Sequence, residues 1–236
     1  VVSSIGMLFA VFVTVIEIIN PVLVLSAVLL GALIGSAFAL KVKMTSIPEM
    51  VALFNGFGGL SSFFLAWSEF NNLSAISLIM ILSFMTVLIG GITFSGSVVA
   101  FFKLSEILKG NNNFLNKASR WFLIFSFLFV IIAVIQVIAG GLGYEFIDLA
   151  LIQKIFIALL IISLLAGLAF VLPIGGGDMP VVISLLNSFS GIAAASAGVL
   201  LTNTALIVAG CLVGASGLVL TLIMAKSMNR TLYCLL

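Results

Sequence analysis

Two asparagines stand in matching surroundings and are the residues best placed to do chemistry. The segment 47–59 (IPEMVALFNGFGG) contains Asn55, and the segment 179–191 (MPVVISLLNSFSG) contains Asn187, with the Pro, Asn, Phe and Gly positions paired at one offset of 132 residues. An amide can donate and accept hydrogen bonds, but it cannot take up a proton near neutral pH. The chemistry that this pattern predicts is therefore the holding of water or of a polar partner.

The position of each asparagine on its helix decides what it can reach. A proline is well tolerated in the first turn of a helix, and an asparagine seven residues later lies about 10 Å along the axis at about 1.5 Å per residue. In a membrane helix, an amide at that depth must find its partner inside the bundle. The sequence leaves two alternatives open: interhelical packing contacts, or a water-lined proton path formed by Asn55, Asn187, Ser188 and Ser97.

The amino-acid composition indicates that the segments carrying these residues lie in a membrane. Hydrophobic residues make up 64% of the 236-residue chain and charged residues only 7%, whereas a soluble domain has about 25% charged residues. The apolar runs are continuous over roughly 20 residues, the length of a membrane-spanning helix, and they lack the alternation of barrel strands. The sequence therefore predicts an all-α integral membrane protein.

The apolar runs predict a bundle of about eight transmembrane helices in one domain over residues 1–236. A polar loop at 103–119 separates two halves, about 1–110 and 111–236, each with one asparagine motif on its third helix. Both motif helices run in the same direction, so the sequence predicts a parallel internal repeat. The expected spans are 2–19, 22–40, 48–67, 75–102, 120–139, 149–172, 180–200 and 204–226.

The basic residues predict the orientation of the chain. With these spans, eight of the nine basic residues fall on one side, and Lys154 alone falls on the other. The positive-inside rule places that side, with both termini, in the cytoplasm or its equivalent. Because the basic loops are explained by topology, the net charge of +2 does not indicate nucleic-acid binding. With no His and two separated Cys, the chain also lacks the pattern of a metal site.

Asp178 is the most informative single residue outside the motif helices. It lies in the glycine-rich loop 173–180, which leads into the second motif helix. It can act as a helix N-cap, or as a titratable group at the inner mouth of a path. The loop does not match a nucleotide-binding glycine fingerprint, because no buried strand is expected before it.

Several long segments resemble one family of membrane proteins. They are residues 43–52, 92–104, 177–191, 207–217 and 224–230. Together they make the chain similar, over nearly its whole length, to the beta subunit of proton-translocating NAD(P) transhydrogenase. The resemblance implies a membrane domain that conducts protons while soluble domains transfer a hydride from NADH to NADP+.

The resemblance also implies roles for particular residues. Asn187 matches a channel-lining asparagine of the family, and Asp178 and Arg230 match residues of an inner gate that couples the path to the NADP(H) domain. Asn55 stands where many members have a histidine, so any relay there must be water held by the amide or a group on another subunit. Helix packing is expected at three small residues of the last span, Gly210, Gly214 and Gly217.

The partners and cofactors are likewise implied by the resemblance. The NADP(H)-binding domain is not expected within this chain, so NADP(H) and NAD(H) would bind to partner domains and the chain itself would bind no cofactor. Transhydrogenase alpha subunits, the lipid membrane and a dimer of protomers are expected. The expected location is the bacterial cytoplasmic membrane or the mitochondrial inner membrane, with the termini on the cytoplasmic or matrix side. The alternatives are a secondary transporter of a small solute and a purely structural membrane anchor.

Overall fold

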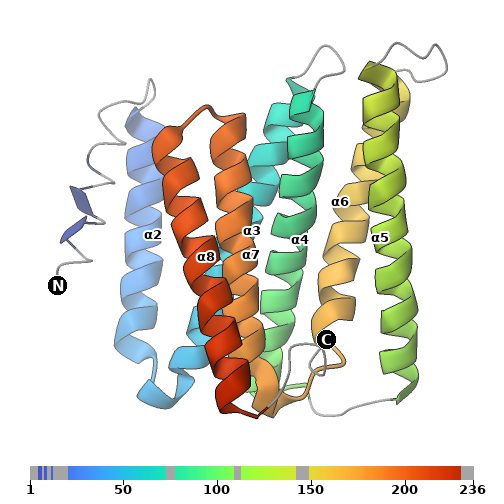
Figure 1. The fold of residues 1–236 in the computed structure, drawn as a ribbon. Helices are drawn as coiled ribbons and strands as arrows, with labels where there is room; N and C mark the ends of the chain where they lie inside the picture. Colours follow the sequence, from blue (N-terminus) through green and yellow to red (C-terminus); the bar gives the residue numbers. More distant parts are fainter. Residues whose placement is uncertain are drawn as a thin grey trace. The chain divides into compact units, whose positions relative to one another are not determined.

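The structure is a computed structural model, and it describes residues 21–72, 78–108, 113–141 and 149–229, with residues 5, 6, 8, 9 and 12 as isolated positions. Within this part of the chain it is helical and contains no strand (Figure 1). Seven of its helices are long and apolar enough to cross a membrane. The prediction of an all-α membrane bundle is confirmed, whereas the first expected span, 2–19, lies outside the described helices.

The helix bounds follow the apolar runs closely, because backbone polar groups must be satisfied within the segment wherever hydrocarbon surrounds it. Two short 3-10 turns, η1 and η2, directly precede α3 and α7. The elements are α2 (Pro21–Lys41), η1 (Met44–Ser46), α3 (Ile47–Asn71), α4 (Leu78–Leu104), α5 (Asn113–Gly141), α6 (Leu149–Val171), η2 (Gly176–Asp178), α7 (Met179–Leu200) and α8 (Thr204–Ser227).

The loop expected at 103–119 is shorter than the sequence predicted. Helix α4 continues to Leu104, and α5 begins at Asn113 although its apolar, membrane-spanning part starts only at Ala118. The expected boundary was wrong because it was placed where the apolar run stops. A helix already nucleated in hydrocarbon adds further turns at little cost, so polar residues extend it beyond the membrane.

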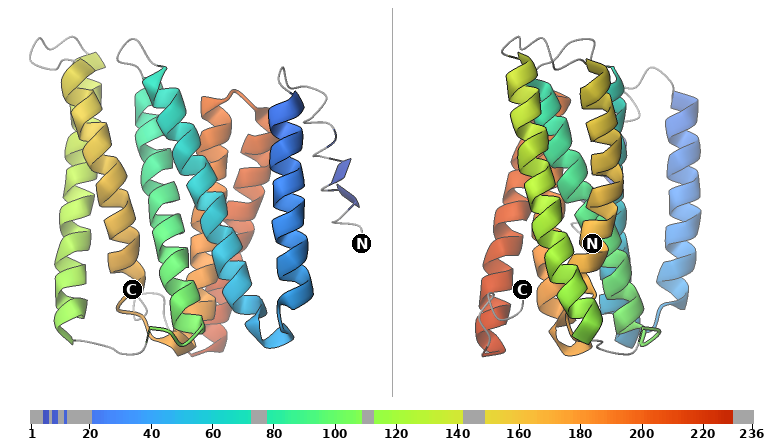
Figure 2. Two further views of the ribbon diagram at one scale, coloured as in Figure 1. Left: turned by 180° about the vertical axis from the view of Figure 1, so that it is seen from behind. Right: turned by 90° about the vertical axis from the view of Figure 1, so that its right-hand side faces the viewer.

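The chain divides into two compact units, Val1–Ile47 and Pro48–Leu236. Helix α2 belongs to the first unit, and α3 to α8 belong to the second. The division of the domain into halves near residue 110 stays a prediction. In the second unit, the starts of α3 and α7 share one end with the last turns of α4 and α6; we call this the Asp178 end (Figure 2).

Helix α4 is the centre of the second unit. Glycines bring it close to its neighbours: a Cβ on Gly91 would lie 2.7 Å from Ser163 Cβ of α6, and a Cβ on Gly96 would lie 3.2 Å from Leu186 Cδ2 of α7. Such contacts between small residues are how membrane helices approach closely. Helix α4 is therefore placed to present side chains to both motif helices.

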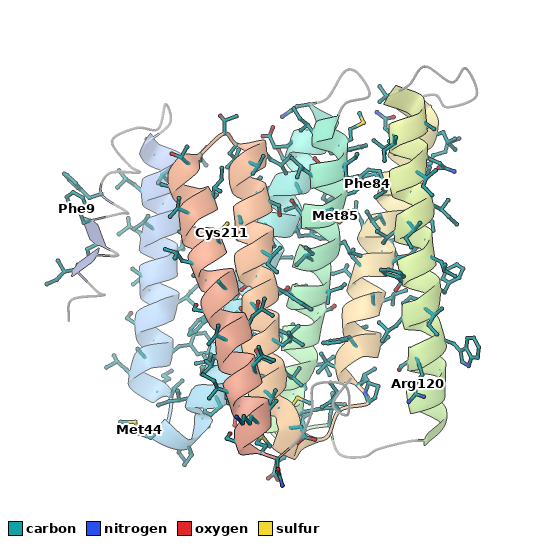
Figure 3. The ribbon with its side chains drawn as sticks, in the orientation of Figure 1. Phe9, Met44, Phe84, Met85, Arg120 and Cys211 are labelled. Atoms are coloured by element: carbon teal, nitrogen blue, oxygen red, sulfur yellow. The ribbon has the colours of Figure 1, made fainter. Side chains whose placement is uncertain are left out.

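Two apolar clusters fill the second unit at its opposite ends. At the end away from Asp178, Phe70 of α3 and Phe156 of α6 stack with ring centroids 3.8 Å apart, and Phe84 of α4 (labelled in Figure 3) packs against both rings. At the Asp178 end, apolar residues of α3, α4, α6 and α7 form the second cluster, which we call the inner apolar cluster. Its buried members are Ala52, Val99, Ala100, Val171, Ile174, Met179, Val182, Ile183 and Leu186.

Candidate functional site

The internal repeat is visible in the backbone before each motif helix. The turn η1 (Met44–Ser46) and the turn η2 (Gly176–Asp178) stand at the same offset of 132 residues as the asparagines. The residues before them have nearly the same extended conformation, with φ −75° and ψ 152° at Lys43 and φ −70° and ψ 154° at Gly175. Both motif helices thus begin from the same local fold.

The helices that follow the motif helices repeat as well, in a register that the sequence left open. A Cβ on Gly59 of α3 would lie 2.9 Å from the carbonyl oxygen of Gly90 of α4. A Cβ on Gly191 of α7 would lie 2.9 Å from the carbonyl oxygen of Gly210 of α8. Gly90 and Gly210 are 120 residues apart, whereas Gly59 and Gly191 are 132 residues apart. The chain between Gly191 and Gly210 is therefore shorter than the chain between Gly59 and Gly90 by the difference between these two offsets. We call α3–α4 the first hairpin and α7–α8 the second hairpin.

At one pair of positions where the two helices of a hairpin touch, the glycine and the serine are exchanged between the first and the second hairpin. In the first hairpin Gly56 of α3 faces Ser97 of α4, because a Cβ on Gly56 would lie 3.1 Å from Ser97 Cβ. In the second hairpin Ser188 of α7 faces Gly217 of α8, since a Cβ on Gly217 would lie 3.0 Å from Ser188 Cβ. The serine therefore stands on the outer helix of one hairpin and on the motif helix of the other.

This exchange decides what each motif asparagine can bind. Asn55 Nδ2 donates to Ser97 Oγ of α4 at 3.1 Å, and Ser190 Oγ of α7 donates to Asn55 Oδ1 at 2.8 Å. Ser190 Oγ also lies 2.8 Å from the carbonyl oxygen of Asn187. Asn55, Ser97 and Ser190 form what we call the amide tie, which joins α3, α4 and α7 in the interior of the second unit. A path shared by Asn55 and Asn187 requires the two motif helices to approach each other. Nothing in the sequence pattern singled out Ser190, whose counterpart in the first motif is Gly58.

Asn187 differs from Asn55 in having no such ties. Its side chain is half-buried, and among the described residues no group forms a hydrogen bond with its amide. The position on α8 that corresponds to Ser97 is Gly217, which has no hydroxyl to offer. An amide in a membrane bundle whose donors and acceptor are unused by protein is suited to hold water or a polar group of a partner.

Ser188 faces α8 and not the amide tie. Its hydroxyl is fully buried and donates to the carbonyl oxygen of Gly214 at 2.7 Å. Gly210, Gly214 and Gly217 are all buried in this contact between α7 and α8. The structure thus joins Asn55 and Ser97 to α7 through Ser190 and turns Ser188 toward α8; the roles of Asn187 and Ser188 in a proton path stay predictions.

Polar residues also gather at the Asp178 end. Asp178 is half-buried at the N-cap position of α7, where its side chain does not cap the helix. Lys103 Nζ donates to the carbonyl oxygens of Val171, at 3.2 Å, and of Leu172 and Ile174. Because these carbonyls end α6 and begin the loop to Asp178, Lys103 fixes the start of that loop. Arg230, the other expected gate residue, lies outside the described residues.

Lys103 has a structural role beyond the one that the sequence predicted, which was only that of a basic residue that sets the orientation of the chain in the membrane. A lysine in the last turn of a helix can satisfy the orphan carbonyls of helix C-termini, but the helix in question here is a neighbour 68 residues away in sequence. Nearby, Ser105 Oγ donates to Glu49 Oε2 at 3.2 Å and connects the last turn of α4 with the first turn of α3. No local sequence signal predicts either contact.

Within the described residues, the candidate site contains neither the setting of a dinucleotide fingerprint nor a cluster of metal-ligating side chains. The glycine-rich turn at 175–178 follows helix α6, whereas a dinucleotide fingerprint follows a strand. In the part of the chain that the structure describes, no group of three or more His, Cys, Asp or Glu side chains could hold a metal. The arrangement offers uncharged amide and hydroxyl groups, which order water and do not perform redox chemistry.

Comparison with known proteins gives one family. A sequence model described as "NAD(P) transhydrogenase beta subunit" matches residues 1–236. The chain is 34% identical over 216 residues to a protein named NAD(P) transhydrogenase subunit beta from Rhodospirillum rubrum, and to a protein of the same name from a designated strain of that organism. Each alignment covers 88% of this chain and 44% of the relative, so the chain spans less than half the length of these relatives. The chain belongs to the NAD(P) transhydrogenase beta subunit family.

Proposed function

We propose that this chain is the proton-conducting membrane part of an NAD(P) transhydrogenase. In this role it couples proton translocation to hydride transfer from NADH to NADP+, which soluble domains carry out. Membership of the family over residues 1–236 supports this function and gives no support to a small-solute transporter. The nucleotides bind to partner domains, and no step of the hydride transfer is assigned to residues of this chain.

The half-buried amide of Asn187, which has no protein partner in the described residues, carries the proposal. An amide without a protein hydrogen bond is costly in an apolar surrounding unless water or another polar group satisfies it, and the half-buried side chain of Asn187 is partly accessible to such a group. Water at Asn187 lies one helical turn from Ser190 and thus beside the amide tie. The amide tie fixes the orientation of the Asn55 side chain, whereas the Asn187 side chain can still bind water molecules of the path.

Asp178 and Arg230 form the gate in this proposal. Asp178 ends a turn whose start is held by Lys103, so motion of a docked domain at this end can change the contacts of the carboxylate. The transhydrogenase alpha subunits, a dimer of protomers, and termini on the cytoplasmic or matrix side complete the proposed assembly.

The test is to reconstitute Asn187→Leu with the partner subunits and to measure proton pumping together with NADPH formation. We expect both activities to be lost together while assembly is retained, because leucine removes the water-holding amide without removing a protein hydrogen bond. Gln136→Leu on α5 is the matched control: its Oε1 is buried without a partner and it lies outside the amide tie. Full pumping by Asn187→Leu would contradict the proposal.

A second variant separates the gate from the path. Asp178→Asn keeps the size of the side chain but removes its charge. We expect it to change the affinity and release of NADP(H) more than the rate of proton movement, because the gate lies beside the NADP(H) domain. Nucleotide affinities that match those of the unaltered protein would leave Asp178 as a residue of the helix start only.

A further inference from the structure

The side chain of Lys103 is turned toward a neighbouring helix instead of the membrane surface. A lysine near the end of a membrane helix usually extends its charged group to the headgroups or to water. Lys103 is half-buried, and its Nζ donates to the carbonyl oxygens of Val171, at 3.2 Å, and of Leu172 and Ile174. An ammonium group has three N–H donors, so these three carbonyl oxygens use all of them.

The three carbonyl groups lie where α6 ends and the Asp178 loop begins. The last carbonyl groups of a helix have no intrahelical donor, and Pro173 cannot supply one because it has no N–H. Unpaired backbone groups are costly in an apolar surrounding. Lys103 supplies these donors from α4, so the course of the chain after α6 depends on a residue of another helix.

The loop between α6 and α7 has a held part and an open part. Ile174 is held twice, because its carbonyl oxygen accepts from Lys103 and its side chain is buried in the inner apolar cluster. Met179, the first residue of α7, is fully buried in the same cluster. Between them the glycines 175–177 are exposed, and a Cβ on any of them would meet nothing within 4 Å. Asp178 is thus carried by a short open segment between two held residues.

Helix α4 lies between α6 and α7 (Figure 1), but it meets them in different ways. A Cβ on Gly167 of α6 would lie 2.9 Å from the Cα of Ile92 of α4, so these two backbones are in close contact. The contact of Gly96 of α4 with α7 is made instead by the side chain of Leu186. Closely packed interiors transmit displacement with little compression. We therefore treat α4 and α6 as one body against which α7 can shift.

The amide tie crosses from this body to α7. Asn55 is bonded to Ser97 of α4 at 3.1 Å and to Ser190 of α7 at 2.8 Å. A shift of α7 against α4 changes the length or the angle of these two hydrogen bonds, and hydrogen bonds weaken steeply when either departs from its preferred range. Ser97 lies six residues before Lys103 on α4, about 9 Å along the axis at about 1.5 Å per residue. One helix thus holds both the amide tie and the start of the Asp178 loop.

We propose that Lys103 is the positioning residue through which movement of the Asp178 loop acts on the amide tie. Lys103 holds the start of the loop on α4 and α6, so α7 is the part that moves when a docked domain displaces Asp178. Without the three carbonyl contacts, the loop yields at residues 172–174 and the displacement does not reach Ser190. This inference rests on the proposed function and names a residue on which its coupling depends.

The test is the response of NADP+ affinity to a proton gradient in vesicles that contain the complete complex. Coupled sites change each other's affinity, so the quantity measured is the ratio of the affinities with and without the gradient. Lys103→Met keeps the length of the side chain but has no charge and no donor. We expect it to bring the ratio toward one, a loss of about fivefold or more.

Ser105→Ala is the matched control. Ser105 directly follows α4, as close to its end as Lys103, but its hydroxyl donates to Glu49 of α3 and not to the Asp178 loop. We expect this variant to keep the ratio of the unaltered protein. A loss in Ser105→Ala equal to that in Lys103→Met would show a general disturbance of this end of α4 and would overturn the inference.

Lys103→Arg separates positioning from the orientation of the chain in the membrane. It keeps the positive charge that orientation requires, but a planar guanidinium cannot direct its donors to three converging carbonyl oxygens as an ammonium does. We expect the complex to assemble and its ratio to lie between those of Lys103→Met and the unaltered protein. An unaltered ratio in either variant would overturn the inference, and Lys103→Arg decides alone if Lys103→Met does not assemble.

A double variant tests whether Lys103 acts through the Asp178 loop. We expect Lys103→Met with Asp178→Asn to change the logarithm of the ratio by less than the sum of the two single changes, since residues that act through one element are not additive. Additive changes would overturn the inference. Normal pumping by Asn187→Leu would overturn the proposed function itself, whereas loss of pumping there with an unaltered ratio in both Lys103 variants would overturn this inference alone.

Discussion

The first and second hairpins have the same arrangement of a turn, a motif helix and an outer helix, but their polar side chains make different contacts. In both, a 3-10 turn leads into a motif helix, and a glycine of that helix contacts a glycine of the next. In the first hairpin, Asn55 is bonded to Ser97 of α4. In the second hairpin, the serine stands on the motif helix instead, and Ser188 Oγ donates to the carbonyl oxygen of Gly214 of α8. The position of this one hydroxyl differs between the hairpins, and among the described residues the Asn55 amide has hydrogen-bond partners whereas the Asn187 amide has none.

The two hairpins are also packed to different degrees. The nearest atom to a Cβ on Gly59 would be Thr93 Cβ at 2.8 Å, whereas a Cβ on Gly191 would lie 2.7 Å from the Cα of Gly214 and still closer to its nitrogen. Ser184, Ser188 and Thr221 add hydrogen bonds between α7 and α8. The second hairpin is thus joined by close backbone contacts and by hydroxyl groups, while in the first hairpin the Asn55 amide itself supplies a hydrogen bond between the two helices.

The largest expected effect comes from adding a methyl group at the two glycine contacts. We expect Gly191→Ala to destabilise the protein by about 1–3 kcal/mol through overpacking, and Gly59→Ala to destabilise it less, because its neighbours are less close. The measurement is the melting temperature of the purified complex in detergent. Gly58→Ala, which meets nothing within 4 Å, is the control and should not lower the melting temperature. Equal losses at Gly191 and Gly59 would break the comparison of packing.

The next effect concerns the two asparagines. Asn55→Leu removes two hydrogen bonds and leaves the hydroxyl of Ser97 without its donor, whereas Ser190 keeps the carbonyl oxygen of Asn187 as an acceptor, so we expect a loss of about 1–3 kcal/mol in stability. Asn187→Leu breaks no hydrogen bond of its side chain and should melt close to the unaltered protein. The comparison fails if Asn187→Leu proves the less stable of the two.

A double substitution sharpens the comparison by giving the second hairpin the pattern of the first. Ser188→Gly with Gly217→Ser moves the hydroxyl from α7 to α8, where the sequence of the first hairpin has it. We expect the new hydroxyl to accept a hydrogen bond from Asn187 and proton pumping to fall, with a loss of about 1–3 kcal/mol in stability, because a Cβ at position 217 would lie 2.9 Å from the backbone nitrogen and Cα of residue 188. The single variant Ser188→Gly is the control, because it removes a hydroxyl without tying the amide. Unchanged pumping in the double variant would show that a free Asn187 amide is not required.

The smallest structural effect is expected in the turns before the motif helices. A Cβ on Gly176 of η2 meets nothing within 4 Å, and the glycine does not use a left-handed backbone, so we expect Gly176→Ala to change the melting temperature little. The corresponding turn η1 has Met44 at this position, which shows that the local fold accepts a side chain. Slower coupled turnover in Gly176→Ala with unchanged melting would assign the glycine to motion of the Asp178 loop; loss of folding would contradict the open geometry.

Much of the fold could be predicted from the sequence, because in hydrocarbon the backbone has few solutions. Continuous apolar runs predicted seven helices that the structure contains, and the paired prolines and asparagines predicted that α3 and α7 are equivalent. The start of α5 was missed, because it depends on helix propagation outside the membrane and not on hydropathy. The sequence also indicated that the asparagines face the interior, since an amide exposed to lipid is costly.

The tertiary structure alone decided which partner each polar group received. The register of α4 against α3 and of α8 against α7 depends on contacts between residues tens of positions apart, and glycines in both outer helices permitted several registers. Only in the folded chain does Ser190 reach Asn55, from 135 residues away, and Lys103 reach the end of α6. The sequence by itself determined where polar groups enter the membrane, because burial there is costly whatever the packing; close packing then determined which amide is tied and which is free.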